Sequence, residues 1–274
     1  MRSDVRISFI GGGNMASALI GGLAGTLTAG ERIHVVDINP ASLDGLKQRL
    51  GITVAGSIDA AVAESDVIVL SVKPQQMRQV AADVRPHVAN QLVLSVAAGI
   101  PAAALSAWLD GYRAIVRTMP NTPALIGQGI TGLFALDGVS APQRALADDI
   151  LRAAGATVWV DDETMLDAVT AMSGSGPAYV FYFIEAMQQA GQELGFTPEQ
   201  ATQLALATFR GATELAARSE EPTPVLRQRV TSPGGTTFAA ISAMEQSGVK
   251  PAIVAAIHAA AARSKELGEE FGRT

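Results

Sequence analysis

The sequence predicts an α/β protein in which a doubly wound sheet forms the N-terminal part and only helices follow. Up to about residue 117, short apolar runs alternate with helical segments, a pattern typical of a right-handed parallel α/β sheet, and two further strands are expected before residue 161. From residue 163 onward no strand pattern is evident. We therefore expect two domains, residues 1–161 and residues 162–274, with ligands at the carboxyl ends of the strands.

Each expected strand is a short run of apolar and β-branched residues. The run at residues 66–70 is almost uninterrupted, as in a strand buried on both faces of a parallel sheet. The expected strands are residues 5–10, 33–37, 52–54, 66–70, 92–96, 114–117, 130–136 and 157–160.

The expected helices carry start and stop signals. Gly51 ends one helix, Ser57 is placed to cap the next, and Pro74 suits a first helical turn. Residues 268–274 are expected to be a frayed polar end. The expected helices are residues 14–20, 41–50, 58–64, 101–109 and 143–153 between the strands, and 180–193, 198–218, 224–230, 239–246 and 251–267 after them.

The first strand runs into a glycine-rich turn. Gly11, Gly13 and Ala16 fit the dinucleotide fingerprint G-x-G-x-x-G/A. Gly11 permits a tight turn, Gly13 leaves room for a pyrophosphate, and Ala16 lets the helix lie close to the sheet. A purely structural glycine turn is the alternative, but this turn follows a strand, opens a helix and precedes a second strand. The sequence therefore predicts a Rossmann-type domain that binds a nicotinamide or flavin dinucleotide.

Asp37 ends the second strand, about 20 residues after the fingerprint, where an acidic residue is expected to bind a ribose 2′-hydroxyl. A carboxylate there repels a 2′-phosphate, and Ile38 stands where an arginine could have bound one. The residues alone therefore favour NADH over NADPH. The alternative is that Asp37 is a solvated strand end.

Two further loops, residues 71–74 and 119–123, are expected at the same edge of the sheet. In the second loop, prolines on both sides of Asn121 and Thr122 make a stiff segment, for which a plain turn is the alternative.

Two stretches rich in glycine and hydroxyl side chains interrupt the helical part, at residues 172–179 and 231–237. Each leads into a helix, where exposed N–H groups and hydroxyls suit a carboxylate ligand. Ordinary capping by Ser or Thr explains either stretch alone. Two such stretches after a dinucleotide-binding domain favour a substrate pocket.

The composition argues against several classes of protein. A net charge of −6 without runs of like charge gives no footprint for nucleic acid, and no apolar stretch approaches the ~20 residues that span a bilayer. The absence of cysteine excludes disulfides and thiolate metal sites and fits a cytoplasmic protein. We expect no signal peptide, no metal, and neither a nucleic-acid nor a membrane partner.

Few residues are available as a general base. Lysine occurs only at positions 47, 73, 250 and 265, none of them near either glycine-rich stretch. Histidine occurs at positions 34, 87 and 258, without a carboxylate at a suggestive spacing. Since dehydrogenation of an alcohol usually needs such a base, the chain favours a substrate with an already protonated C=N bond, whose carbon accepts hydride directly.

Five motifs together resemble pyrroline-5-carboxylate reductase: FIGGGNMA (9–16), SVKPQ (71–75), MPNTPA (119–124), SGSGPAY (173–179) and TSPGGTT (231–237). The resemblance covers essentially the whole chain. It implies NAD(P)H-dependent reduction of 1-pyrroline-5-carboxylate to L-proline, the final step of proline biosynthesis. It also implies an all-α C-terminal dimerisation domain, an active site at the interface of a homodimer, and assembly of dimers, commonly into a decamer.

The resemblance further implies roles for individual residues. Ser175 and Thr237 would act in catalysis, with the Thr237 hydroxyl near the ring nitrogen of the substrate. Glu220 would neighbour the substrate, although a solvated helix end explains it equally well. The residues implied to bind the cofactor are Gly11, Gly12, Gly13, Asn14, Met15, Val72, Lys73, Pro74, Asn121 and Thr122, and those implied to bind the substrate carboxylate are Ser232, Gly235, Thr236 and Thr237.

In one respect the chain departs from the family. Many relatives use NADPH and carry a small or basic residue after the second strand, where this chain has Asp37 and Ile38. Two other functions stay open from the residues. One is a related imine or hydroxyacid oxidoreductase, whose hydroxyacid branch the missing lysine disfavours, and the other is a non-catalytic dinucleotide-binding or scaffold protein.

Overall fold

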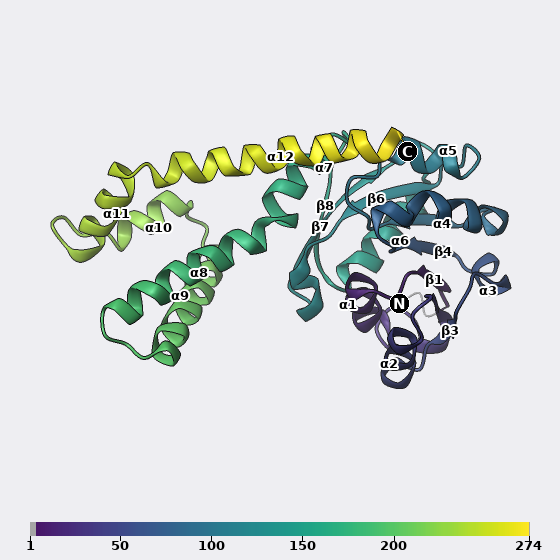
Figure 1. Ribbon diagram of the computed structural model, residues 1–274, viewed down its shortest axis with the longest axis horizontal. Helices are drawn as coiled ribbons and strands as arrows, with labels where there is room; N and C mark the ends of the chain where they lie inside the picture. The colour runs from purple at the N-terminus through teal and green to yellow at the C-terminus, as the bar shows by residue number, and fades with distance from the viewer. Residues whose placement is uncertain (1–3, 274) are drawn as a thin grey trace. The chain divides into compact units, whose positions relative to one another are not determined.

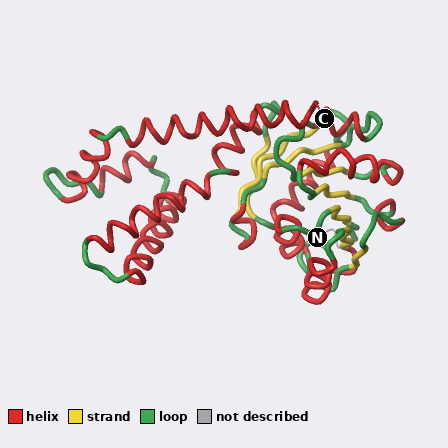
Figure 2. Tube along the Cα trace, in the orientation of Figure 1, coloured by secondary structure: helices red, strands yellow, loops and turns green. Residues whose placement is uncertain are grey.

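The computed structural model describes residues 4–273 and divides into two compact units (Figure 1). The first unit contains the chain up to Ser175 together with the chain from Ala260 onward, and the second is Gly176–Ala259. All the named strands lie in the first unit, as Figure 2 shows. The predicted fold class, a doubly wound α/β sheet followed by helices, is confirmed. The predicted domain boundary after residue 161 differs from this division into units and stays a prediction.

The first unit is built on an eight-stranded sheet with the order β3-β2-β1-β4-β5-β6-β7-β8. Neighbouring strands are parallel except for β6 and β7, which are antiparallel. The short turn η4 (Thr122–Ile126) connects this pair, whereas a parallel pair needs a crossover of about a dozen residues or more. The strands are β1 (Ile7–Ile10), β2 (Ile33–Val36), β3 (Thr53–Ala55), β4 (Val67–Leu70), β5 (Leu92–Ser95), β6 (Ile115–Met119), β7 (Gly129–Ala135) and β8 (Gly155–Trp159).

Two layers of helices cover the two faces of the sheet. Strand β4 is apolar throughout because Val67 and Val69 face one layer while Ile68 and Leu70 face the other, all fully buried. One layer consists of α1 (Asn14–Leu23), α2 (Pro40–Leu50) and α6 (Ala141–Arg152), and the other of α3 (Ala60–Ala63), α4 (Met77–Val84) and α5 (Ala102–Trp108). Three short turns lie between these strands and helices: η1 (Gly30–Arg32) before β2, η2 (Pro74–Gln76) before α4, and η3 (Arg85–His87) after α4.

The start of α3 corrects one expectation. The Asp59 side chain accepts a hydrogen bond from the Ala61 N–H at 3.0 Å and caps this helix, so the prediction that Ser57 is the cap is wrong. Aspartate and serine serve equally well as N-caps, and the chain places Asp59 immediately before the first helical residue. Pro74 opens η2, which leads into α4, as the sequence predicts.

The second unit consists of helices. Among residues 176–259, all of which the structure describes, only Ala201 and Ala205 are buried, and both lie on α9. The helices are α8 (Gly176–Glu193), α9 (Pro198–Arg218), α10 (Thr223–Arg229), α11 (Thr236–Gln246) and the first part of α12 (Val249–Arg273). Across residues 4–273, no helix combines the length and apolarity needed to traverse a bilayer.

The end of α12 belongs to the first unit, and the expectation of a frayed end after residue 267 is wrong for the described residues up to 273. Phe271 packs against the core cluster that contains Ile100, and a Cβ at Gly99 would lie 3.1 Å from its ring. The buried Ser264 donates a hydrogen bond to Asp167 of α7 (Met165–Val169) at 2.7 Å. These contacts keep the last turns helical.

The Asp148 carboxylate joins α6 to the edge strand β8. Thr157 donates a hydrogen bond to it at 2.7 Å and Trp159 at 3.2 Å, and Arg152 forms an ion pair with it one turn along the helix. Burial acts to raise the pKa of Asp148, but the hydrogen bonds from Thr157, Arg152 and Trp159, together with the Arg152 charge, outweigh it. The pKa therefore lies below its ordinary value.

We predict that Asp148→Asn lowers the free energy of unfolding at pH 7 by about 1–2 kcal/mol, because charge-assisted hydrogen bonds are lost. A carboxyl with a depressed folded-state pKa stabilises the protein above its unfolded pKa, and this contribution is lost as the pH falls through the folded value. The deficit of the variant should therefore shrink below about pH 4. Guanidinium denaturation at fixed protein concentration measures it, with the exposed Asp149→Asn as control. Equal losses in both variants would contradict this role of Asp148.

Candidate functional site

The turn after β1 is held by the loop after β4. Gly11 has a φ of +104°, and a Cβ on it would lie 2.7 Å from the Ser71 carbonyl oxygen. The Ser71 hydroxyl donates to the Gly11 carbonyl at 2.8 Å and to the Ile10 carbonyl at 3.1 Å. Both the left-handed φ and the close backbone contact require glycine at position 11.

Gly13 plays a different part in the same turn. It is the N-cap of α1, its φ is −70°, and a Cβ on it would meet no atom within 4 Å. No side chain caps this helix, so the N–H groups of its first turn are available to a ligand. Ala16 is fully buried against the sheet. The open space beside Gly13, next to an uncapped helix start, suits a phosphate group.

The Asp37 carboxylate is fixed at the end of β2 by two backbone groups. One oxygen accepts a hydrogen bond from the Gly12 N–H at 2.6 Å, and the other accepts one from the Asn39 N–H at 2.7 Å. The side chain is therefore part of the glycine-rich turn as well as of the strand end, and its charge is held in one place.

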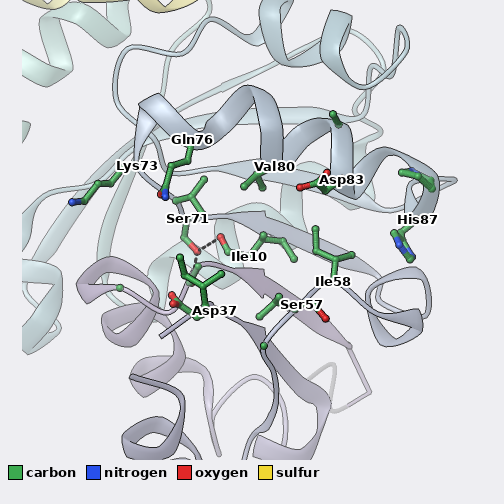
Figure 3. Close-up of a pocket in the computed structure, with 18 residues that line it drawn as sticks. Ile10, Asp37, Ser57, Ile58, Ser71, Lys73, Gln76, Val80, Asp83 and His87 are labelled. Carbon is green, nitrogen blue, oxygen red and sulfur yellow. Dashed lines mark hydrogen bonds between the residues drawn. The ribbon is translucent and has the colours of Figure 1, made fainter. Parts of the chain in front are cut away.

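These three loops border a cavity of about 770 Å³ between the carboxyl ends of the strands and α4 (Figure 3). Five of the residues predicted to bind a cofactor line it: Gly11, Gly13, Asp37, Val72 and Lys73. The volume lies in the range typical of small-molecule and cofactor sites. A dinucleotide fits the chemistry of this lining, because an uncapped helix start and a fixed carboxylate lie on one cavity.

Several lining residues were not predicted. They include Ser57 and Ile58 from the loop before α3, and Gln76, Val80, Asp83 and His87 from α4 and its flanking turns. The intervals between Gln76, Val80, Asp83 and His87 are four, three and four residues. This spacing begins just after Pro74 and places the four side chains on one face of a helix. That spacing was the signal in the sequence.

The remaining residues predicted to bind the cofactor lie outside this lining. Asn14 and Met15 form the start of α1. The Asn121 side chain accepts a hydrogen bond from the Ile130 N–H at 2.9 Å and so fixes the turn between β6 and β7, and Thr122 is exposed. This hydrogen bond gives Asn121 a structural role in a plain turn, which was the alternative to a cofactor-binding role.

A second cavity of about 450 Å³ in the first unit joins two other predicted residues, Pro74 and Ser175. Ser175 directly follows a π-helical turn, η5 (Thr170–Gly174), and its N–H donates to the Thr170 carbonyl at 2.8 Å. π-helical turns occur frequently at functional sites. Gly99 and residues of α12, among them Ser264 and Phe271, also line this cavity.

The residues predicted to bind a carboxylate lie in the second unit, at the start of α11. Gly235 is the N-cap, Thr236 and Thr237 are the first helical residues, and no side chain caps the helix. A Cβ at Gly235 would lie 2.5 Å from the Ser232 hydroxyl, so glycine lets the loop fold tightly under this helix start. Glu220 is exposed between α9 and α10, beside Glu221, which pairs with Arg229.

Comparison with known proteins gives family matches in both halves of the chain. Residues 163–267 match the family described as "Pyrroline-5-carboxylate reductase dimerisation". Residues 6–99 match the family described as "NADP oxidoreductase coenzyme F420-dependent". A pyrroline-5-carboxylate reductase of Pseudomonas aeruginosa is 47% identical over 272 residues, which are 99% of this chain and 100% of the relative.

Two solved structures are similar over nearly the whole chain. A pyrroline-5-carboxylate reductase from Coxiella burnetii is 39% identical with a TM-score of 0.91, and the match covers 96% of this chain and 98% of that one. A pyrroline carboxylate reductase from Plasmodium falciparum, solved with NADP bound, is 28% identical with a TM-score of 0.87, and the match covers 98% of this chain and 100% of that one.

We predict that substitutions at two glycines of this turn affect different properties, one the binding of the cofactor and the other the stability of the fold. Gly13→Val should fold normally, because its Cβ has open space, but should weaken NADH and NADPH binding by about tenfold or more, since the side chain enters the cavity. Gly11→Ala should lower the free energy of unfolding by about 1–3 kcal/mol, because its Cβ meets backbone at a positive φ. Thermal melts and cofactor titrations separate the two effects. Normal affinity in folded Gly13→Val would place the dinucleotide elsewhere.

Proposed function

This chain belongs to the pyrroline-5-carboxylate reductase family, and from that premise we propose which of its residues bind the cofactor and the substrate. The family resemblance predicted from five motifs is confirmed. The protein is an NAD(P)-dependent oxidoreductase that reduces 1-pyrroline-5-carboxylate to L-proline. The roles of individual residues, the preferred cofactor and the assembly are the proposals that follow.

We propose that the dinucleotide lies in the cavity bordered by Gly13, Asp37 and Val72, and that NADH is the preferred cofactor. The observation that carries this proposal is the fixed Asp37 carboxylate, whose oxygens lie 2.6 Å and 2.7 Å from the Gly12 and Asn39 nitrogens. A carboxylate accepts hydrogen bonds from the ribose hydroxyls of NADH and repels the additional phosphate of NADPH. Because two backbone N–H groups hold it, Asp37 cannot swing away to avoid that phosphate.

We predict that the purified protein oxidises both cofactors with 1-pyrroline-5-carboxylate and has the higher kcat/KM with NADH. Asp37→Asn removes the charge and should shift the NADH-to-NADPH ratio toward NADPH by about tenfold, equivalent to ~1.4 kcal/mol. Absorbance at the nicotinamide band measures both reactions. Asp44→Asn on the exposed side of α2 is the charge-matched control. An unchanged ratio in Asp37→Asn would remove Asp37 from cofactor selection, and absence of turnover with both cofactors would contradict the reaction.

We propose that the substrate carboxylate binds at the start of α11, with Ser232, Gly235, Thr236 and Thr237. The uncapped N–H groups and the positive end of this 11-residue helix supply donors and a favourable potential for an anion. Ser175 is assigned to the nicotinamide side of the reaction, together with Val72, Lys73 and Pro74. Glu220 is proposed as a neighbour of the substrate loop.

The substrate's chemistry explains why no histidine or lysine base is needed. When bound, the nicotinamide supplies a hydride. A protonated ring nitrogen makes the adjacent carbon electrophilic, and after reduction the same nitrogen is a neutral amine, so no proton has to leave the substrate in this step. We assign to the Thr237 hydroxyl the task of accepting a hydrogen bond from that protonated nitrogen, which keeps the proton in place. The protein then contributes mainly orientation and carboxylate binding.

We predict that Thr237→Ala lowers kcat/KM for 1-pyrroline-5-carboxylate by about 10- to 100-fold, as expected for loss of a hydrogen bond to a charged group worth ~1.5–3 kcal/mol. The Kd for NADH should stay within about twofold, a change below 0.5 kcal/mol. Thr237→Ser retains the hydroxyl and should recover most of the activity. If the serine variant is as impaired as the alanine variant, the methyl group or the helix start matters and the hydroxyl does not.

The matched dimerisation family at residues 163–267 supports a homo-oligomer. We propose a homodimer formed through the helical domain, with further assembly into a pentamer of dimers. The support is physical: a unit of residues 176–259 with two buried alanines has almost no core of its own. Large apolar side chains on it are exposed, among them Phe181, Tyr182, Leu204, Leu215 and Phe238. Burying them against a second copy would supply the missing core. A cytoplasmic location, and the absence of metal, nucleic-acid and membrane partners, stay predictions.

A further inference from the structure

The far end of the larger cavity carries polar groups that the reaction does not use. Asp83 on α4 and His87 in η3 line this end, and Figure 3 shows both away from Asp37, on the α4 side of the cavity. Between the two ends, Ile58 and Val80 face the cavity from opposite sides. The cavity therefore has an acidic group at each end and two aliphatic side chains between them.

This pattern matches the chemistry of a purine base. The two faces of a purine are apolar and suit aliphatic side chains, while its edge carries the groups that distinguish one base from another. Adenine presents an amino group at C6, which donates hydrogen bonds, whereas hypoxanthine presents a carbonyl oxygen at C6, which accepts them. A carboxylate only accepts hydrogen bonds, so beside the C6 group it favours the amino group of adenine over the carbonyl oxygen of hypoxanthine.

We propose that Asp83 selects adenine at this end of the cavity by accepting a hydrogen bond from its amino group, with Ile58 and Val80 against the two faces of the ring. The inference rests on the proposed binding of the dinucleotide in this cavity. Asp83 is then a specificity-determining residue for the cofactor, remote from the transferred hydride.

A neighbouring side chain orients the carboxylate. Gln79, one helical turn earlier on α4, donates a hydrogen bond from its amide nitrogen to one Asp83 oxygen at 2.8 Å. A carboxylate accepts through both oxygens, so this bond leaves acceptor capacity for a base. Holding the side chain in one rotamer before the ligand arrives reduces the entropy lost on binding.

The test compares two cofactors that differ only in the base: NADH and reduced nicotinamide hypoxanthine dinucleotide. Because Asp83 is exposed in the free protein, we expect a moderate preference. Calorimetric titration of the full chain should show NADH binding about five- to tenfold more tightly. Steady-state kinetics should show the same ratio in KM and equal kcat, since the nicotinamide end is identical.

Asp83→Asn should reduce this preference to about twofold or less, because an amide side chain can donate to the carbonyl of hypoxanthine as well as accept from adenine. Asp44→Asn, an exposed aspartate on α2 outside the cavity, is the matched control and should keep the wild-type ratio. Far-ultraviolet circular dichroism verifies that both variants are folded.

The outcomes distinguish a failure of the role of Asp83 from a failure of the proposed cofactor site. Equal affinity of the wild-type protein for the two dinucleotides would overturn the role of Asp83 while leaving the proposed cofactor site intact. A preference that persists in Asp83→Asn would assign the selection to other groups and equally overturn it. If neither dinucleotide binds, the proposed cofactor site fails, and the inference fails with it.

Discussion

The close contact between the turn after β1 and the loop after β4 is the constraint on which the arrangement of the larger cavity depends. Gly11 can adopt its positive φ and lie against the Ser71 carbonyl only because it has no Cβ. Ser71 then donates to the Gly11 carbonyl, and Asp37 accepts from the Gly12 N–H, so three loops are joined at one sheet edge. This junction sets the direction in which α1 starts, and Gly11 and Gly13 in the turn before it line the larger cavity.

The helices of the second unit, in contrast, form almost no buried core of their own. Only two alanines among residues 176–259 are buried, whereas the first unit buries nearly every residue of its central strands. Helices of this length are marginal alone in water and normally depend on packing of an apolar face. The unit that carries the proposed carboxylate-binding loop therefore depends on association for its stability. Under the proposal that this loop binds the substrate carboxylate, assembly would therefore also support substrate binding.

Much of the fold could be predicted from local patterns, whereas other features depend on the length of a connection or on contacts that are remote in sequence. The apolar run at 66–70 and the fingerprint at 11–16 gave correct elements because strand burial and turn sterics leave local signals. The antiparallel direction of β7 depends on the length of its connection to β6. The helical end of α12 depends on the contact of Phe271 with Gly99, 172 residues earlier in the chain, which no local pattern contains. In the site, glycines and Asp37 were predictable from a motif, whereas Asp83 required the helical spacing of α4 to be considered.

Asp37 is proposed to select the cofactor, and it also supports the glycine-rich turn. The same carboxylate that faces the cavity also accepts hydrogen bonds from the Gly12 and Asn39 N–H groups, so replacing it with a small or basic residue removes two supports of the turn at once. Leaving the buried Gly12 N–H unpaired costs about 1–3 kcal/mol, whereas the exposed Asn39 N–H can donate to water instead. A chain with a different residue at this position must therefore supply another acceptor for the Gly12 N–H, such as an oxygen of a bound 2′-phosphate. If Asp37 selects the cofactor as proposed, selection of the cofactor and stability of the glycine-rich turn are coupled through this one side chain.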